Sequence, residues 1–91
     1  MKRVIIKITG KVQGVSFRQK TLLQATTLGL TGYVSNIADG SVQVLAQGSY
    51  PAVDKLINWC QSGAPLAKVD RVYVEDDEAD DIYLDFSIVQ L

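Results

Sequence analysis

The segment from Gly10 to Arg18 combines the residue types of an anion-binding loop. Its glycines lie where an alternating apolar pattern gives way to a helical one, so we expect the segment to join a strand to a helix. The first N–H groups of a helix have no partner within it, and the helix dipole places positive charge beside them. Gly14 has no Cβ and lets a ligand approach the backbone closely. The loop therefore predicts a binding site for an anion.

Arg18 is the unusual residue of this segment because it is a cation in the first turn of the predicted helix. The helix dipole repels a cation there, at a cost of about 0.3–1 kcal/mol, and a bound anion would reverse that effect. The planar guanidinium group can also contact a phosphate through two N–H groups. The alternative is an ordinary glycine turn followed by a solvated arginine, and a Gly-x-x-x-Gly spacing alone does not decide between the two.

Asn36 is the second candidate, because it lies late in a segment, residues 31–37, that predicts a strand. Asparagine is depleted in strands, so one at this position needs a reason. Its side-chain amide can donate and accept at once, which is what positioning a water molecule requires. The alternative is that Asn36 lies near the end of a hairpin and hydrogen-bonds its own backbone. Asp39 and Gly40 are interpreted as turn residues only.

The 91-residue chain has no histidine and a single cysteine, Cys60. These counts remove the usual ligands and bases of zinc-finger, thiolate and Ser-His-Asp chemistry, so any catalysis must proceed without a histidine base.

The acidic run from Glu75 to Asp81 lacks the pattern of a Ca²⁺-binding loop and is interpreted as a solvated turn. One cysteine cannot form an internal disulfide, which predicts a reducing compartment, the cytoplasm. Cys60 falls on the apolar face of a predicted helix, where a structural thiol is expected.

The charge distribution favours a small anionic ligand. Residues 1–38 contain six of the nine lysines and arginines and none of the ten acids, whereas residues 39–91 contain all ten acids. A chain that is acidic overall but basic in its first part suits a small anion better than a long nucleic-acid track.

No apolar run approaches the roughly 18 residues that a membrane span needs, and Lys7 interrupts the first apolar run early, so we expect neither a membrane segment nor a signal peptide.

The order of the predicted elements indicates the fold. Alternating apolar and polar residues predict strands, and apolar residues three and four apart predict helices. The expected elements are a strand around residues 3–9, a helix from residue 16 or 17 to 28, strands at 31–37 and 41–47, a helix at about 50–62, a strand at 69–74 and a last strand at 82–88. This order predicts an α+β fold, a ferredoxin-like split βαβ sandwich with two helices on one face of an antiparallel sheet. We expect residues 1–91 to form one domain.

Together the two motif segments resemble the acylphosphatase family. The family's Gly-x-Val-Gln-Gly-Val-x-Phe-Arg loop matches the chain from Gly10 to Arg18, and its Gly-x-Val-x-Asn-x-x-Asp-Gly-x-Val hairpin matches from Gly32 to Val42. The resemblance covers nearly the whole chain and implies the same ferredoxin-like fold. It also implies hydrolysis of the carboxyl-phosphate bond of acyl phosphates to a carboxylate and inorganic phosphate, without metal or cofactor.

The resemblance also implies roles for the residues at the matching positions. Arg18 would bind the phosphoryl group, and Asn36, the second catalytic residue, would orient the attacking water. Backbone amides of the loop would hold the phosphate, and the residues expected there are Gln13, Gly14, Val15, Ser16, Phe17 and Arg18. An acyl phosphate is already activated, so water can attack without a strong base, and we expect the substrate's own phosphate oxygen to take the proton.

The expected partners are a small acyl phosphate and inorganic phosphate, with no nucleic acid and no membrane, and the chain is expected to act as a cytoplasmic monomer.

Two other functions are considered. A binding module of this fold occurs as part of larger carbamoyl-transfer proteins, but a chain with both Arg18 and Asn36 favours the enzyme. An RNA-binding sheet needs stacking aromatic residues, and Phe17 and Phe86 do not occupy such positions.

Overall fold

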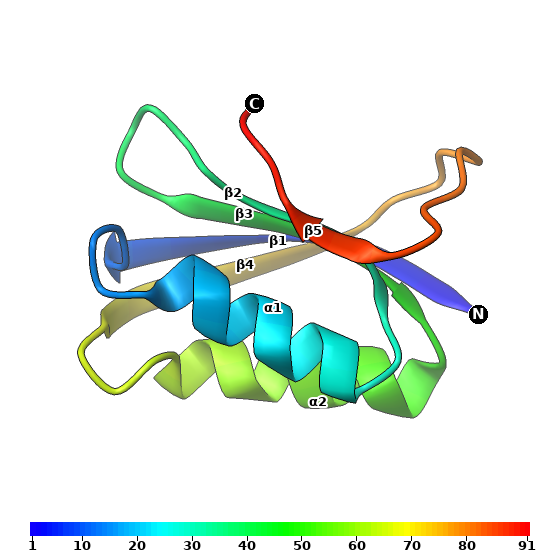
Figure 1. The fold of residues 1–91 in the computed structure, drawn as a ribbon, viewed down its shortest axis with the longest axis horizontal. Coiled ribbons are helices and arrows are strands. Elements are labelled where there is room, and N and C mark those ends of the chain that lie inside the picture. Colours follow the sequence, from blue (N-terminus) through cyan, green and yellow to red (C-terminus); the bar gives the residue numbers. More distant parts are fainter.

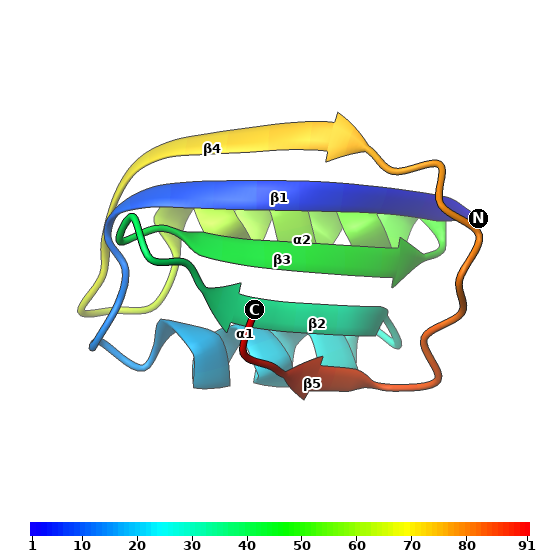
Figure 2. The same cartoon turned by 90° about the horizontal axis from the view of Figure 1, so that it is seen from above.

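The fold is a five-stranded sheet with both helices on one face (Figures 1 and 2). The computed structural model describes residues 1–91. In chain order the elements are β1 (Lys2–Lys11), α1 (Phe17–Thr27), β2 (Thr31–Asn36), β3 (Val42–Gly48), α2 (Tyr50–Ser62), β4 (Lys68–Asp76) and β5 (Phe86–Ile88). The strands lie in the order β4-β1-β3-β2-β5. The predicted α+β class, with two helices on one face of a sheet in the ferredoxin-like arrangement, is confirmed.

The sheet is mixed rather than antiparallel, because β5 runs parallel to β2. All other neighbouring strands are antiparallel, so the prediction of an antiparallel sheet is wrong for the last strand. The reason is that β4 and β5 lie at opposite edges, and the chain must cross the end of the sheet between them (Figure 2). It reaches the far edge beside the start of β2, where Phe86 pairs with Gly32, and so continues in the direction of β2.

This crossing also makes β5 shorter than predicted. β5 spans Phe86–Ile88, whereas the alternating pattern predicted a strand from residue 82. Ile82 and Leu84 are 78% and 91% exposed and belong to the crossing, so the inference of a longer strand was wrong. Likewise, β4 extends to Asp76, so the first two residues of the acidic run belong to a strand and not to the predicted turn.

Arg3 ties the crossing segment to the sheet. Its Nε donates to Asp77 Oδ2 at 2.6 Å, and its Nη2 donates to Asp81 Oδ1 at 2.7 Å. The guanidinium group also lies over the ring of Tyr83, 5.4 Å from the ring centroid. The hydrogen bond from Arg3 lowers the pKa of Asp81. Part of the acidic run is therefore held by charge-assisted hydrogen bonds.

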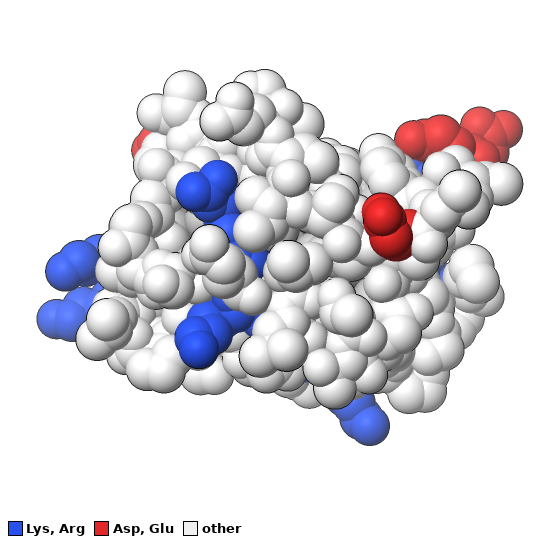
Figure 3. All heavy atoms as spheres, in the orientation of Figure 1, with Lys and Arg blue, Asp and Glu red and all other residues white.

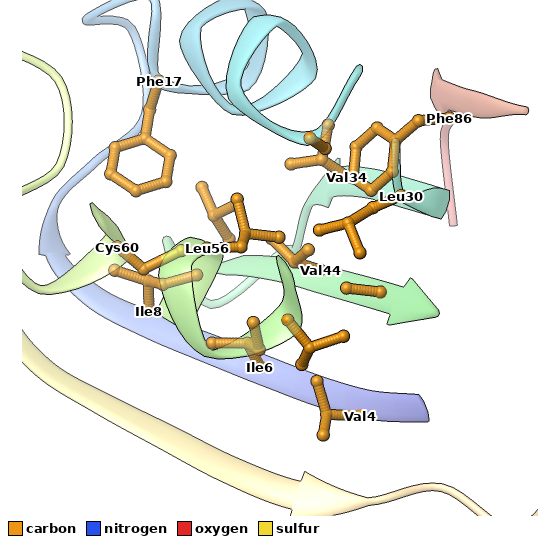
Figure 4. Packing of buried hydrophobic residues seen from close by; sticks show 14 of the residues in the cluster. Val4, Ile6, Ile8, Phe17, Leu30, Val34, Val44, Leu56, Cys60 and Phe86 are labelled. Carbon is orange, nitrogen blue, oxygen red and sulfur yellow. The ribbon is translucent and has the colours of Figure 1, made fainter. Parts of the chain in front are cut away.

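The core lies between the sheet and the two helices (Figure 4). Side chains alternate along each strand, so Val4, Ile6 and Ile8 of β1 all point to the helices and are fully buried. On the neighbouring strand β3, Val44 lies opposite Ile6 and faces the same way. Cys60 of α2 packs into this core, and burial raises the pKa of its thiol to about 12. Each fully buried side chain of this kind contributes about 1.5–3 kcal/mol to stability.

Local sequence signals define the helix ends. After α1, Gly29 adopts a left-handed φ of 73°, and Leu30 N donates to Ala25 O at 2.9 Å, which closes the last turn. Before α2, the side chain of Ser49 accepts a hydrogen bond from Ala52 N at 3.3 Å. Neither helix has both the length and the apolar character that crossing a membrane would take.

The two sequence motifs meet at one end of the sheet (Figure 2). The loop between β1 and α1 leaves the sheet at this end, and the hairpin between β2 and β3 turns at the same end. β1 and β3 are antiparallel neighbours there, with Ile8 opposite Val42. The pairing therefore places the loop of residues 12–16 beside the hairpin of residues 37–41.

Candidate active site

Unpaired backbone N–H groups are concentrated in the loop between β1 and α1. None of the N–H groups from Gln13 to Gln19 donates to a backbone carbonyl. Gly14 and Ser16 have left-handed conformations, with φ of 74° and 63°, and Ser16 is the only non-glycine residue of the chain with a positive φ. Successive N–H groups in such a backbone can face one anion. A Cβ built on Gly14 meets no protein atom within 4 Å, so the loop is open to a ligand at that point.

Two hollows adjoin this loop. The smaller, which we call the loop hollow, measures about 240 Å³ and is lined by Val12, Gly14, Ser16, Phe17, Arg18, Gln19 and Asn36. The larger, which we call the hairpin cleft, measures about 440 Å³ and is lined by Gln13, Arg18, Ser35, Asn36, Ile37, Ala38, Val89, Gln90 and Leu91. Arg18 and Asn36 line both hollows. The two residues that the sequence singled out thus lie together, at the boundary between the hollows.

Arg18 is the second residue of α1 and has no charged partner within the chain. Its guanidinium group takes part in none of the ion pairs of the structure, and the first turn of α1 contains no acidic residue. The repulsion between this cation and the helix dipole is therefore not offset by a carboxylate. An anion in the loop hollow would offset it.

Asn36 is the last residue of β2, and its side chain lies on the helix side of the sheet. It pairs with Val42, and the alternation along β2 places it on the same face as the buried Val34. Its Oδ1 atom is buried and accepts no hydrogen bond. A buried acceptor without a partner costs about 1–3 kcal/mol. A water molecule or a ligand that donates to Oδ1 would remove this cost.

Gln13 links the loop to the hairpin. Its Nε2 donates to Ile37 O at 2.8 Å and to Ser41 O at 2.9 Å. These two bonds use the side-chain amide protons, so the group that Gln13 can still offer to an anion is its backbone N–H. The link holds the strand that carries Asn36 against the loop that leads to Arg18.

The turn of the hairpin is held by Asp39. Its Oδ1 accepts hydrogen bonds from Ser41 Oγ at 2.6 Å and from Ser41 N at 2.9 Å. Its Oδ2 accepts from Lys7 Nζ at 2.9 Å. The hydrogen bonds from Ser41, followed by the one from Lys7, hold the pKa of Asp39 well below its usual range. Asp39 therefore stabilises the turn, in line with the turn interpretation of the sequence.

Like Gln13 and Gly14, two further predicted phosphate-binding residues, Val15 and Phe17, can contribute only their backbone. The ring of Phe17 is buried in the core, 5.4 Å from the ring of Trp59. The side chain of Val15 packs against the core, and Val15 lines neither hollow. Both residues keep unpaired N–H groups. For the loop, phosphate binding thus remains a prediction about backbone amides.

One wall of the hairpin cleft was missed by sequence reasoning. It consists of Val89, Gln90 and Leu91, which follow β5. Val89 N donates to Val34 O at 3.0 Å, which continues the parallel pairing of β5 with β2. The alternation at the end of the chain gives no signal for this wall, because its position depends on the direction in which β5 enters the sheet.

The surface charge is divided between the two ends of the molecule. On the face shown in Figure 3, most basic side chains gather at the end that carries the loop between β1 and α1. Acidic side chains are seen mainly at the opposite end, where the segment after β4 crosses. The candidate site therefore lies at the more basic end, which favours the approach of an anion.

Comparison with known proteins decides the family. The acylphosphatase family model matches residues 4–88, which include both the loop and the hairpin of the site. A curated acylphosphatase from Shewanella amazonensis is 62% identical over 90 residues, which cover 99% of each chain. This chain belongs to the acylphosphatase family. The resemblance inferred from the two motifs is thereby confirmed.

Solved structures agree with the family assignment. The crystal structure of acylphosphatase from Bacillus subtilis matches with a TM-score of 0.93 and 34% identity, over 98% of this chain and 99% of that one. Full-length HypF in its phosphate- and nucleotide-bound form matches with a TM-score of 0.88 and 28% identity, over 97% of this chain but 12% of HypF. The acylphosphatase fold thus occurs both as a separate chain and as a small part of a larger one.

Proposed function

We propose that this chain is an acylphosphatase, which hydrolyses the carboxyl-phosphate bond of an acyl phosphate to a carboxylate and inorganic phosphate. Besides the family, one observation supports this most. Arg18, which has no ion-pair partner, and Asn36, whose Oδ1 has no donor, border the same hollow beside a run of unpaired N–H groups. Such a site offers donors and positive charge to a phosphoryl group, and an acceptor to a water molecule.

Arg18 and the loop amides would hold the phosphoryl group. In phosphoryl transfer, negative charge is spread over three equatorial oxygens in the transition state. A guanidinium group and N–H groups that are already in place stabilise this charge without a cost of reorganisation. The amides assigned to this role are those of residues 13–18, and Arg18 adds a planar pair of N–H groups.

Asn36 would orient the attacking water through a hydrogen bond from the water to Oδ1. The water oxygen forms a bond to phosphorus while the bond from phosphorus to the acyl oxygen breaks, and its electron pair leaves on the carboxylate. The proton of the water passes to a phosphate oxygen of the substrate. A carboxylate is a stable leaving group at neutral pH, so the reaction needs no histidine or other strong base.

This route uses only water and groups of the chain, and it calls for no metal or cofactor. We also propose that the chain acts as a monomer, since Arg18, Asn36 and the loop amides supply all the groups that the proposed reaction needs without a second copy. A cytoplasmic location is supported by the single, buried cysteine. The net charge of −1 speaks against nucleic acid as a partner.

The test is hydrolysis of benzoyl phosphate by the purified chain, with and without EDTA. We expect turnover that EDTA does not change. Phenyl phosphate is the matched control substrate, because it has a similar ring and phosphoryl group but no carboxylate leaving group, and it should not be hydrolysed. A folded chain that leaves benzoyl phosphate intact would rule out the enzyme.

A further inference from the structure

The side chain of Phe17 connects the loop between β1 and α1 to the end of α2. Phe17 is the first residue of α1 and directly follows Ser16 of the loop. Its backbone N–H is one of the unpaired groups proposed to hold the phosphoryl group. Its ring points into the core, and only 1% of the residue is exposed (Figure 4). The position of this N–H therefore depends on the residues that hold the ring.

Two residues near the end of α2 hold the ring of Phe17. The ring of Trp59 lies 5.4 Å from it, measured between centroids, at an interplanar angle of 49°. A Cβ built on Gly63 would lie only 2.7 Å from Cε2 of Phe17. Gly63 N donates to Trp59 O at 2.7 Å, which fixes the two residues relative to each other. We call Trp59 and Gly63 the ring socket.

The ring socket lies at the end of the molecule that carries the candidate site (Figures 1 and 2). α2 ends at Ser62, and the chain then turns into β4. Near the start of β4, Val69 pairs with Gly10, which lies near the end of β1 just before the loop. A Cβ on Gly63 would also lie 3.1 Å from Cγ2 of Val69. The end of α2 thus adjoins both the Phe17 ring and the strand that borders the loop.

We propose that Gly63 is a positioning residue for phosphate binding, which acts through the ring of Phe17 on the N–H groups at the start of α1. This inference rests on the proposed function. Carbon atoms in contact are normally about 3.5–4.0 Å apart, so the space between Gly63 and the ring cannot take a methyl group. Gly63 also has a φ of 68°, which side chains disfavour. The close approach allows the ring, and with it the first turn of α1, to keep its position.

The experiment compares Gly63→Ala with Gly29→Ala, which is the matched control. Both glycines follow a helix and have a left-handed φ, 68° and 73°, so alanine should strain the backbone and lower stability at both positions. A Cβ on Gly29 meets no protein atom within 4 Å, whereas a Cβ on Gly63 meets the Phe17 ring. The measurements are kcat and KM for benzoyl phosphate, and the inhibition constant Ki of inorganic phosphate.

Gly63→Ala should weaken phosphate binding, because the ring has to move by about 0.8 Å to reach an ordinary carbon contact. We expect Ki and KM to rise by about 3- to 10-fold and kcat/KM to fall by about 10- to 100-fold. Gly29→Ala should leave Ki and KM within about twofold of the wild type. Partial unfolding cannot imitate this result, since it lowers the apparent kcat but leaves Ki and KM of the folded fraction unchanged.

The double variant Phe17→Leu/Gly63→Ala tests the route through the ring. Leucine leaves room for the added methyl group, so the double variant should bind phosphate more tightly than the two single effects predict when multiplied. If Gly63→Ala alone does not fold, the double variant is compared with Phe17→Leu alone and should bind phosphate at least as tightly.

Three results would overturn the role of Gly63 while the hydrolase stands. The first is a Ki and KM of Gly63→Ala within about twofold of those of Gly29→Ala. The second is a double variant whose effect equals the product of the single effects, and the third is weaker phosphate binding by the double variant than by Phe17→Leu. A wild type that neither binds phosphate nor hydrolyses benzoyl phosphate overturns the proposed function itself.

Discussion

At the scale of single residues, the candidate site consists of polar groups that the protein leaves without partners. Most buried polar atoms in folded proteins are hydrogen-bonded. Here two buried side-chain oxygens are not, Asn36 Oδ1 and Gln47 Oε1, and only Asn36 lines a hollow of the site. Arg18, which forms no ion pair, lines the same hollow. These features are explained together if a ligand completes the interactions.

Replacing Arg18 with lysine should impair both phosphate binding and turnover. Lysine keeps the positive charge but loses the planar pair of N–H groups that contacts two phosphate oxygens. Because the proposed contacts would be made in the ground state and in the transition state, the dissociation constant of inorganic phosphate should rise and kcat should fall. The measurement is kcat together with phosphate inhibition. Arg71→Lys, an exposed arginine of β4 outside both hollows, is the control and should behave as the wild type.

Replacing Asn36 with alanine should impair turnover alone. Loss of one oriented polar contact in the transition state costs on the order of 3–4 kcal/mol, which is a hundred- to thousandfold in kcat. Phosphate should still bind nearly as in the wild type, since the ligands proposed for it are Arg18 and the loop amides. The fold should also survive, because Oδ1 makes no hydrogen bond in the free protein. Weak phosphate binding with an unchanged kcat at saturating substrate would show that the role assigned to Asn36 is wrong.

At the scale of elements, the site depends on the contact between the β1–α1 loop and the β2–β3 hairpin. α1 carries Arg18 and β2 carries Asn36, and a side chain of the loop before α1 connects that loop to the hairpin after β2. Gln13 of the loop makes two hydrogen bonds to hairpin carbonyls, at 2.8 and 2.9 Å. This side-chain link therefore helps to hold Arg18 and Asn36, the residues proposed to act in catalysis, in their relative positions.

Gln13→Ala should therefore reduce both stability and catalytic efficiency. Two lost hydrogen bonds, partly replaced by water, should lower the free energy of unfolding by about 1–2 kcal/mol. Misplacement of reacting groups by as little as about 1 Å can cost a hundredfold in rate, so kcat/KM should fall by roughly 10- to 100-fold. Urea denaturation and steady-state kinetics measure the two effects. Gln61→Ala on the exposed surface of α2 is the control, and equal effects of the two substitutions would contradict the linking role.

The part of the fold that the sequence could predict is the part specified by local signals. The alternation in β1, the turn at Asp39 and Gly40, and the ends of α1 and α2 all depend on neighbouring residues. The parallel pairing of β5 does not, because Ile82 and Leu84 continue an alternating pattern while the chain crosses the sheet. For the same reason Arg18 and Asn36 could be named from the sequence, whereas Val89 could not.

At the scale of the whole molecule, the ends of the sheet are charged differently and serve different purposes. The more basic end carries the candidate site. The other end is closed by Arg3, which binds Asp77 and Asp81 and so fastens the segment that leads to β5. Because β5 positions Val89, the ion pairs of Arg3 at this far end of the sheet also support one wall of the hairpin cleft.

The ion pair between Arg3 and Asp81 should make the free energy of unfolding depend on pH in the acid range. The pKa of Asp81 in the folded protein lies below its ordinary value of 3.8, owing to the hydrogen bond from Arg3. A carboxyl whose pKa is lower in the folded than in the unfolded chain contributes stability that is fully present above its pKa in the unfolded chain. This stability is lost as the pH falls through its pKa in the folded chain. Stability should therefore decline below about pH 4. In Asp81→Asn this decline should be shallower than in Asp80→Asn, a neighbouring control without an ion pair, as measured by urea denaturation between pH 2 and 6.

Inorganic phosphate should stabilise the whole molecule, since it would complete interactions that the free chain lacks. A ligand that binds only the native state stabilises it by RT ln(1 + [L]/Kd), about 2.7 kcal/mol at a hundredfold excess over Kd. In a domain of this size each kcal/mol raises Tm by roughly 4–8 °C, so the increase should be about 10–20 °C. Potassium chloride at equal ionic strength is the control for screening.

The variants decide where this stabilisation arises. Asn36→Ala should keep most of the increase in Tm, because Asn36 is assigned to water, whereas Arg18→Lys should lose most of it. If phosphate leaves the melting curve of the wild type unchanged while the protein still hydrolyses benzoyl phosphate, the anion does not bind at the loop as proposed. An equal loss in both variants would mean that Arg18 and Asn36 act on the same ligand, and the division of roles between phosphate and water would have to be abandoned.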